Sequence, residues 1–449
     1  MMIAEEWARN IVETRFEKFD IEIVERAKQR IIDVVGCAIG GANAAGCSMI
    51  VDLVKEWDGK KEATILVHGV KAPAHNVAMA NSIMARSFDY EPTGPLVDGK
   101  RFVAHVSGTT VPTAVAVAER EHAGGKELIT ALLLGDDIAS RLIAASIPQL
   151  KPWDNTGTVN KFGATAIAGK LRGLDEQQLL NAFGTVINQL AGSYQCVTDG
   201  THSFKLPHGL SARDGIISAE LAKKGWTGVK DPLLSECGYF ALYCQSSKPE
   251  ILTKELGKKF YADSGHKTYP SCGRIQSAIN SALELVREHD MKTEDIDEVI
   301  VNVSPEQVDS TAGQPFELGG SPQTSALFSI QYGVSSVLVR KDVRLEYYTE
   351  EYIREPRVMD FTKKVKLTGE LSPEKMLAAE IKVRMKDGTE FYAAPIRKPL
   401  TSKEIEEKFR TNVAFSKTVT EENAEKVLGL LEKLEELDDV NKVVELLVV

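Results

Sequence analysis

Hydrophobic residues recur at helical spacing along roughly the first 260 residues of the chain. Between Ile21 and Val35 the apolar positions fall three or four residues apart, which places them on one face of a helix. The run Leu128–Leu134 is almost continuously apolar, as in a helix buried on all sides. Pro73 suits the first turn of a long helix that continues to Phe88. The pattern predicts helices at 4–17, 20–39, 48–57, 73–88, 109–122, 125–143, 162–171, 179–191 and 210–223, and a short strand at 63–67.

The pattern changes after about residue 260, where runs of alternating apolar and polar positions appear. Residues 379–385 alternate apolar and charged side chains, as a half-exposed strand does, and Lys386–Thr389 has the composition of a hairpin turn. From Ser402 onward the spacing is helical again. We therefore predict a mainly α chain with a second, α+β domain, divided as 1–262, 263–400 and 401–449. The expected elements of the second domain are strands at 299–303, 365–367, 379–385 and 390–393 and helices at 274–288 and 323–340.

Composition and charge narrow the class of protein. The chain has 449 residues and a formal net charge of -10, which argues against general nucleic-acid binding because that needs a basic face. No apolar run is long enough to span a membrane, and the N-terminus lacks the features of a signal peptide, so we expect a cytoplasmic protein. The six cysteines show no C-x-x-C spacing and no metal-ligand pattern; they are Cys37, Cys47, Cys196, Cys237, Cys244 and Cys272.

The first cluster of chemistry-bearing residues follows the helix predicted at 73–88. Asp89 and Glu91 stand at the end of this helix, and Thr93 adds a hydroxyl in the next turn. The chain then passes through a polar loop and returns with His105 just before another helix. Adjoining helix ends thus gather carboxylates, a hydroxyl and an imidazole, which are groups suited to acid–base chemistry. The alternative is that the two acids are solvated turn residues and the histidine is an incidental neighbour of a helix.

A second cluster stands at the start of the helix predicted at 210–223. It consists of His202, Lys205 and His208, two imidazoles and an amine within seven residues. A lysine at a helix start can bind a carboxylate, and the helix dipole helps it to do so. The alternative is a surface lysine with incidental histidines beside it.

A third cluster, at the boundary between the two predicted domains, supplies Lys267, Cys272 and Arg274. Clefts at domain boundaries commonly bind small molecules, although this segment can also be a basic linker. Cys272 lacks the spaced histidine of a cysteine nucleophile. Tyr332, further along the chain, has the surroundings of a packed aromatic more than of a catalytic one.

The combined chemistry of the three clusters suits one kind of ligand. Their carboxylates, imidazoles, lysines and arginine fit the binding of a small polycarboxylate and the movement of a proton beside one of its carboxylates. Nothing in the sequence signals a metal or an organic cofactor, and the glycine pairs lack the setting of a phosphate-binding loop.

The order of these motifs resembles the MmgE/PrpD family, whose known members include 2-methylcitrate dehydratases, cis-aconitate decarboxylases and an iminodisuccinate epimerase. The resemblance covers nearly the whole chain and rests on the shared order of the motifs. The matching segments are 27–41 with its Asp-x-x-Gly, the Ala-rich helix and acidic turn at 78–93, His105-Val-Ser-Gly, 162–175, Phe204-Lys205-x-x-His208-Gly209, 225–228, Lys267-x-Tyr-Pro-Ser-Cys and Phe328-Ser-x-x-Tyr332.

The resemblance implies a large all-helical domain interrupted by a smaller α+β lid, with the C-terminal helices returning to the first domain. It also implies a cytoplasmic homodimer and chemistry that needs no metal or other cofactor. His208 lies near a family site position, in a segment that is one residue shorter than usual. By position, the family's active site falls on Asp89, Thr93, His105, Lys205, Lys267 and Tyr332.

Two segments depart from the family pattern. Asp154 stands where members commonly have a histidine. After the Tyr-Pro-Ser-Cys segment the family commonly has Arg-x-x-His, but here Gly273 and Gln276 take those places and Arg274 is offset by one. Asp154 can still act as a base and Gln276 can still donate to a carboxylate, although neither does all that a histidine does near neutral pH.

The sequence thus predicts a cofactor-independent lyase on a small di- or tricarboxylic acid, most nearly a 2-methylcitrate dehydratase, which is a hydro-lyase. The alternatives are a cis-aconitate-type decarboxylase, an amino- or imino-dicarboxylate epimerase, and a family member that binds a carboxylate without catalysis. We expect a small carboxylic acid as ligand and no nucleic-acid or membrane partner. The predicted catalytic residues are Asp89, His105, Lys205 and Tyr332, and the predicted substrate-binding residues are Thr93, Asp154, His208, Lys267, Arg274 and Gln276.

Overall fold

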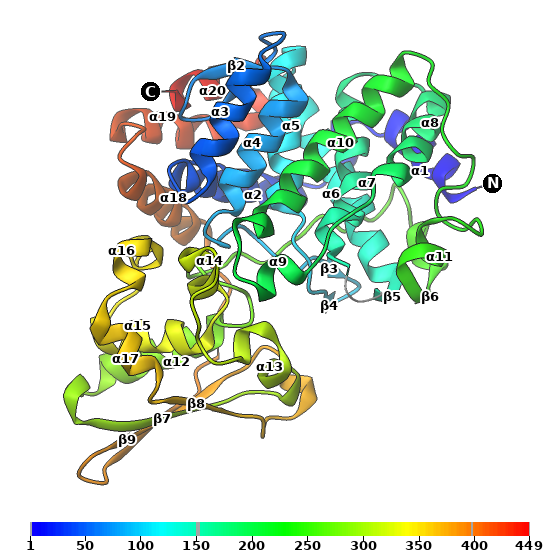
Figure 1. Ribbon diagram of the computed structural model, residues 1–449. Helices are drawn as coiled ribbons and strands as arrows, with labels where there is room; N and C mark the ends of the chain where they lie inside the picture. The colour runs from blue at the N-terminus through cyan, green and yellow to red at the C-terminus, as the bar shows by residue number, and fades with distance from the viewer. Residues whose placement is uncertain (1, 150–152, 397, 449) are drawn as a thin grey trace.

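Two hydrophobic cores organise the chain, one in a helical body and one in a smaller mixed part that we call the lid (Figure 1). The computed structural model describes residues 2–149, 153–396 and 398–448. The body core gathers buried side chains from Trp7 to Ala262 and again from Ile405 to Leu447. The lid core gathers those from Cys272 to Ala393, together with five from the body: Cys37, Phe88, Tyr90, Val197 and Phe204. We propose that these cores correspond to the domains predicted at 1–262 with 401–449 and at 263–400.

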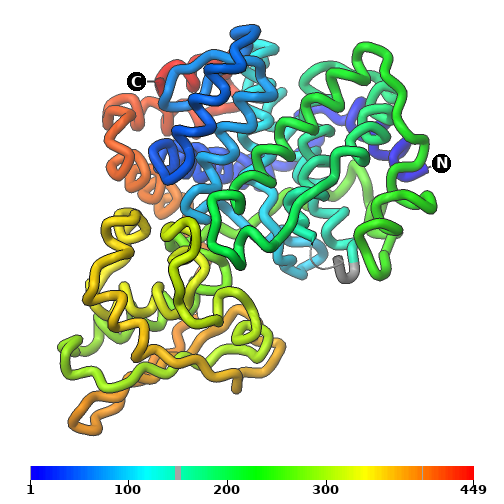
Figure 2. Tube along the Cα trace, in the orientation of Figure 1, coloured from blue at the N-terminus to red at the C-terminus, as the bar shows by residue number. Residues whose placement is uncertain are grey.

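The helical body confirms the helical spacing read from the sequence. Its C-terminal helices pack beside the second helix of the chain, so both ends of the sequence contribute to one core, although the two termini lie on opposite sides of the body (Figure 2). Its main helices are α1 (Ile3–Glu13), α2 (Ile21–Gly41), α3 (Cys47–Trp57), α4 (Ala74–Arg86), α5 (Ser107–Glu121), α6 (Gly125–Ala145), α7 (Val159–Leu171), α8 (Glu176–Val186), α10 (Leu206–Lys223), α18 (Ser402–Ser416) and α19 (Glu421–Glu432).

Small residues let these helices cross closely. A Cβ atom at Gly135 of α6 would lie 2.6 Å from the main-chain oxygen of Gly163 on α7, which real Cβ atoms do not tolerate. A Cβ atom at Gly36 of α2 would lie 3.1 Å from the Phe409 side chain of α18. The glycines therefore set the depth at which α6 meets α7 and α2 meets α18, because native interiors are close-packed.

The lid is a four-stranded sheet with helices packed against it. The strands lie in the order β10-β9-β7-β8, and β7 pairs with β8 in parallel and with β9 antiparallel. In β9, Ile381 and Val383 are buried while the residues between them are more exposed, as the alternating pattern predicted. The lid elements are α12 (Gln276–Glu288), β7 (Ile296–Asn302), α13 (Pro305–Asp309), α14 (Pro322–Leu327), α15 (Ile330–Arg340), β8 (Val365–Thr368), β9 (Glu380–Met385) and β10 (Glu390–Ala393).

The predicted fold class, a mainly α protein with a smaller α+β part inserted in it, is thus confirmed, with local differences. The single helix predicted at 323–340 is two helices, α14 and α15, because the Ser329 hydroxyl accepts from the Tyr332 N–H and starts a new helix. Short hairpins such as β3 (Leu96–Val97) with β4 (Lys100–Arg101) were not predicted. Within the described ranges, no helix has the length and apolarity needed to cross a membrane.

Candidate active site

The end of α4 builds the centre of the site. Asp89 has a φ of 46°, in the left-handed region, and this turn brings its carboxylate back onto the guanidinium of Arg86. Glu91 Oε1 lies 2.8 Å from Arg86 Nη1, and both acids are fully buried. A left-handed aspartate costs about 1 kcal/mol or more and persists where its surroundings hold it, as at functional sites.

His105 joins the two acids after the loop that contains β3 and β4. Its Nδ1 lies 2.8 Å from Glu91 Oε1 and 3.1 Å from Arg86 Nη1. Its main-chain oxygen accepts from the Asn160 side chain of α7 at 2.6 Å. If Nδ1–H donates to the Glu91 carboxylate, the lone pair is on Nε2, so this pairing orients His105 as a base.

His208, in the first turn of α10, packs edge-to-face against His105. The two ring centroids are 6.0 Å apart, and His208 Nδ1 is 3.2 Å from the Thr109 hydroxyl. The N-terminus of α5 can approach α10 because residue 108 is a glycine. A Cβ atom at this position would lie 3.1 Å from both Glu91 and His208. The small residue at position 108 is therefore needed for the two helix starts to meet.

Lys267 reaches the same centre from the segment that connects the body to the lid. Its ammonium pairs with the Asp89 carboxylate and also donates to the Asp89 main-chain oxygen at 2.5 Å. Burial opposes ionisation of Glu91, but the charges of Arg86 and Lys267 and the His105 hydrogen bond outweigh it and hold the pKa of this carboxyl well below its usual range. Glu91 is thus held in its charged form beside two cations.

Other predicted site residues stand around this centre. The Lys205 ammonium donates to the Ala45 main-chain oxygen at 2.7 Å and to Gln323 Oε1 at 3.3 Å, and burial lowers its pKa. The Thr93 hydroxyl donates to the Ala104 main-chain oxygen at 2.7 Å. Asp154 accepts the N–H of Thr156 at 2.9 Å, which caps a short helical turn.

The structure does not bring Tyr332 or Gln276 to the cluster. The Tyr332 hydroxyl donates to the Tyr347 main-chain oxygen inside the lid core, between aromatic rings. The Gln276 amide forms hydrogen bonds with the loop that follows Lys267. Its oxygen accepts hydrogen bonds from two main-chain N–H groups, and its nitrogen donates to the Tyr269 main-chain oxygen and to Ser271. Among the described residues, the polar contacts of both side chains are thus made within the lid and the loop after Lys267, and their predicted roles stay predictions.

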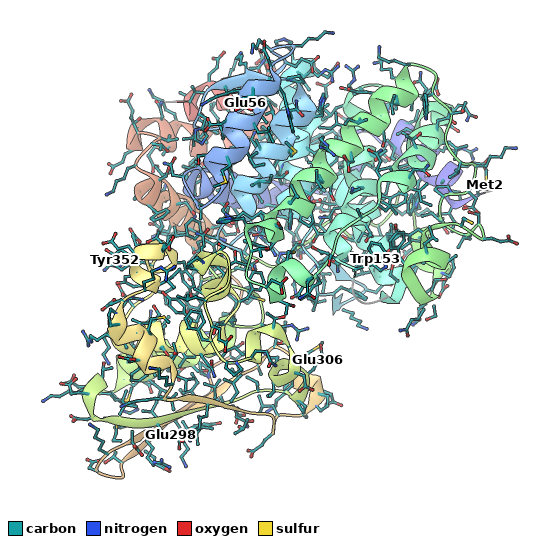
Figure 3. All side chains as sticks on the ribbon, viewed as in Figure 1. Met2, Glu56, Trp153, Glu298, Glu306 and Tyr352 are labelled. Carbon is teal, nitrogen blue, oxygen red and sulfur yellow. The ribbon has the colours of Figure 1, made fainter. Side chains whose placement is uncertain are left out.

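Arg274 lies on the lid, and one of its nitrogens is available. Its Nη2 is 3.0 Å from the carboxylate of Glu306, which Figure 3 labels on α13. Its Nη1 is buried and has no hydrogen-bond partner among the residues that the structure describes. The predicted carboxylate-binding role of Arg274 is therefore compatible with its surroundings.

The sequence analysis missed Arg86, although it contacts Asp89, Glu91 and His105. Its position could have indicated this role. Arg86 lies in the last turn of the helix, three residues before Asp89, a spacing at which opposite charges can pair.

Five polar atoms of this centre are buried and lack a hydrogen-bond partner among the described residues: Arg86 Nε, Asp89 Oδ2, Glu91 Oε2, Ser107 Oγ and His208 Nε2. Buried polar groups in native proteins are almost always paired with protein, water or ligand. This concentration of unpaired donors and acceptors is what a binding site for a polar small molecule requires.

A metal ion fits this centre poorly. Glu91, His105 and His208 offer ligand atoms within 4.8 Å of one another. However, Arg86 Nη1 already contacts Glu91 and His105, at 2.8 and 3.1 Å, and Lys267 adds a second positive charge. A metal ion would lie beside these cations in a buried place, where like charges repel strongly. We therefore assign the centre to acid–base and anion chemistry.

Stability should fall as the pH drops below about 6.5. Burial, with the charge of Arg86, lowers the pKa of His105 and lowers that of His208 well below its usual value. The unfolded chain then takes up protons in a window where the folded chain does not, so the free energy of unfolding decreases as pH falls through that window. Melting temperatures measured from about pH 7.5 to about pH 5.5 should decrease, and less steeply in His208→Asn.

The exposed His122, whose side chain is 74% accessible, is the control. His122→Asn should leave the slope of melting temperature against pH at the wild-type value. An identical slope in His208→Asn and wild type would contradict the assignment of a neutral, buried His208.

Comparison with protein-family models identifies two matching domains. The MmgE/PrpD N-terminal domain matches residues 5–252, and the MmgE/PrpD C-terminal domain matches residues 269–434. Together they include most of the body, the lid and the residues of the centre except Lys267, which lies between the two matched ranges.

Comparison with curated proteins finds similar full-length relatives. The chain is 25% identical to cis-aconitate decarboxylase of Homo sapiens over 455 residues, which cover 95% of this chain and 90% of the relative. It is 24% identical to cis-aconitate decarboxylase of Aspergillus terreus, covering 98% of this chain and 94% of the relative. It is 21% identical to the cis-aconitate decarboxylase-like protein oryM of Aspergillus oryzae.

Proposed function

Because the chain belongs to the MmgE/PrpD family, we propose that it is a lyase that acts on a small di- or tricarboxylic acid. The observation that carries this proposal is the buried centre at the end of α4, in which two carboxylates, two cations and two imidazoles meet. The full-length similarity to enzymes named cis-aconitate decarboxylase supports it.

The groups of the centre divide into those that hold carboxylates and those that move protons. Arg86 Nε and Arg274 Nη1 are donors without a partner in the described part of the chain, and they suit substrate carboxylates. His105, oriented by Glu91, presents Nε2 for proton transfer. Lys205 is buried, and its ammonium lies 5.7 Å from the centre of the Phe204 ring, which the Arg86 guanidinium also approaches, at 5.3 Å; it adds positive charge. Fixed cations of this kind stabilise the charge that develops on a substrate carboxylate during the reaction.

Within this class we favour decarboxylation over the dehydration predicted from the sequence. The curated relatives described above are named cis-aconitate decarboxylases. In this reaction a C–C bond breaks and carbon dioxide leaves. The electron pair remains on the carbon skeleton, delocalised toward a remaining carboxylate, and it takes a proton from His105 after Nε2 of the neutral imidazole has received one from solvent. The new C–H bond thus uses one solvent proton, and His105 returns to its neutral form.

Dehydration of a 2-methylcitrate-like acid is the second candidate, and a specific observation favours it. Asp89 Oδ2 and Glu91 Oε2 are both buried acceptors without a partner among the described residues. A carboxylate oxygen accepts a proton from carbon but cannot donate one while ionised. Such oxygens suit removal of a proton next to a carboxylate, which is the first step of the dehydration.

Proton NMR of the purified protein with cis-aconitate, 2-methylcitrate or citrate in deuterated water tests both candidates. Decarboxylation of cis-aconitate should give new vinyl signals together with released carbon dioxide. Turnover of 2-methylcitrate with all carboxylates retained would select dehydration instead. Line broadening of an acid without any product would contradict both and favour a protein that binds carboxylates without catalysis.

A further inference from the structure

Lys408, on helix α18, contacts the backbone of the centre although it is more than 300 residues from Asp89 in sequence. Its side chain is only 3% exposed. Its ammonium donates to the main-chain oxygen of Tyr90 at 2.7 Å and to that of Lys267 at 3.1 Å. Tyr90 stands between the two acids of the centre. One ammonium therefore binds the backbone on both sides of the Asp89–Lys267 ion pair.

Asp33 of α2 completes this contact. Its Oδ1 lies 2.7 Å from Lys408 Nζ, and its Oδ2 lies 2.5 Å from Nδ1 of His266, the residue before Lys267. The three protons of the Lys408 ammonium thus have three acceptors, and both Asp33 oxygens are used. Its full set of partners gives this buried charge a defined position, as buried ions require.

We propose that Lys408 is a positioning residue of the active site, which holds the Asp89–Glu91 turn in register with Lys267 through their main-chain oxygens. This inference rests on the proposed function for its catalytic consequence. The left-handed backbone at Asp89 needs such support, because strained turns persist only where their surroundings hold them. Displacement of a reacting group by about 1 Å can lower a rate by about 100-fold.

Lys28 offers a matched comparison within the same part of the fold. It lies on α2, its side chain is 4% exposed, and its ammonium donates to the Glu432 main-chain oxygen at 2.7 Å and pairs with Glu435 at 3.1 Å. Like Lys408, it joins α2 to the C-terminal helices. Unlike those of Lys408, its polar contacts within the described ranges, with Glu25, Glu432 and Glu435, all lie outside the centre. If Lys408 had a purely structural role, replacing either lysine would have the same effect on the centre.

The experiment compares Lys408→Met with Lys28→Met by three measurements: melting temperature, kcat/KM, and the NMR titration of the His105 Cε1–H signal, assigned with His105→Gln. Both variants should melt several degrees below wild type. Only Lys408→Met should shift the His105 titration and lower kcat/KM about 100-fold. Lys408→Arg, which keeps the charge, should recover part of both. The charged and titratable groups that face His105 are Arg86, Asp89, Glu91, His208 and Lys267.

A folded Lys408→Met protein with the wild-type His105 titration would overturn the proposal, as would an equal shift in Lys28→Met. If Lys408→Met does not fold, Lys408→Gln, whose amide can donate to one of the two main-chain oxygens, is measured against the same criteria. If wild type turns over none of the acids tested, the proposed function fails, whereas the His105 titration still decides whether Lys408 positions the centre.

Discussion

His105→Gln should lower kcat by about 10²–10⁴-fold while the protein stays folded. The His105 imidazole can both accept and donate a proton, and Glu91 orients it from 2.8 Å. Its side chain is 17% exposed, so the amide can be accommodated with little change in packing. Steady-state turnover of the acid identified by NMR, with far-UV circular dichroism as a check of folding, measures this effect.

The control for this variant is His68→Gln. His68 is also half-buried, and its ring nitrogen lies 3.2 Å from the Ala42 main-chain oxygen, outside the centre. This variant should retain wild-type turnover. Wild-type turnover in His105→Gln would show that the imidazole transfers no proton in the slow step, and the assignment of His105 would have to be withdrawn.

Lys267→Met should have the largest combined effect on stability and activity. It removes one of the two cations that neutralise the Asp89 carboxylate inside a site with no exposed surface on either partner. Removing one partner of a buried ion pair costs about 3–5 kcal/mol of the free energy of unfolding. Because Asp89 also loses the donor to its main-chain oxygen, its turn should shift, and kcat/KM should fall by at least about 100-fold. Urea unfolding and steady-state kinetics measure the two effects.

Lys161→Met separates the two effects of this change. Lys161 is a buried lysine of α7 whose ammonium lies 2.6 Å from Asp214, and neither residue belongs to the centre. This variant should lose a similar free energy of unfolding and keep turnover within a few-fold of wild type. Equal losses of turnover in both variants would mean that Lys267 acts on catalysis only through global stability.

The centre lies where the two cores of the chain adjoin. The acids and His105 come from the body, whereas Lys267 and Arg274 come from the segment that leads into the lid. Side chains of the body, such as Phe88 and Tyr90, pack into the lid core next to the acids.

Much of this molecule follows from local patterns in the sequence. Apolar residues at helical spacing located the helices of the body, and strict alternation of apolar and polar residues located β9. In a helix, residues three or four positions apart share a face, and in a strand, residues two positions apart do. The order of the motifs pointed to the family and to Asp89, His105 and Lys267. These residues share one feature: each stands at a helix end or a domain boundary, which a sequence pattern can locate.

Only the tertiary structure decided which of the polar residues meet. It made Arg86 the common partner of Asp89, Glu91 and His105, and it placed Lys408 beneath them. It also placed the Gln276 amide in hydrogen bonds with a neighbouring loop and the Tyr332 hydroxyl in a hydrogen bond within the lid core. The physical reason is that most of these contacts join residues far apart in the chain. Their geometry depends on how whole helices pack, which the spacing of residues along one segment does not encode.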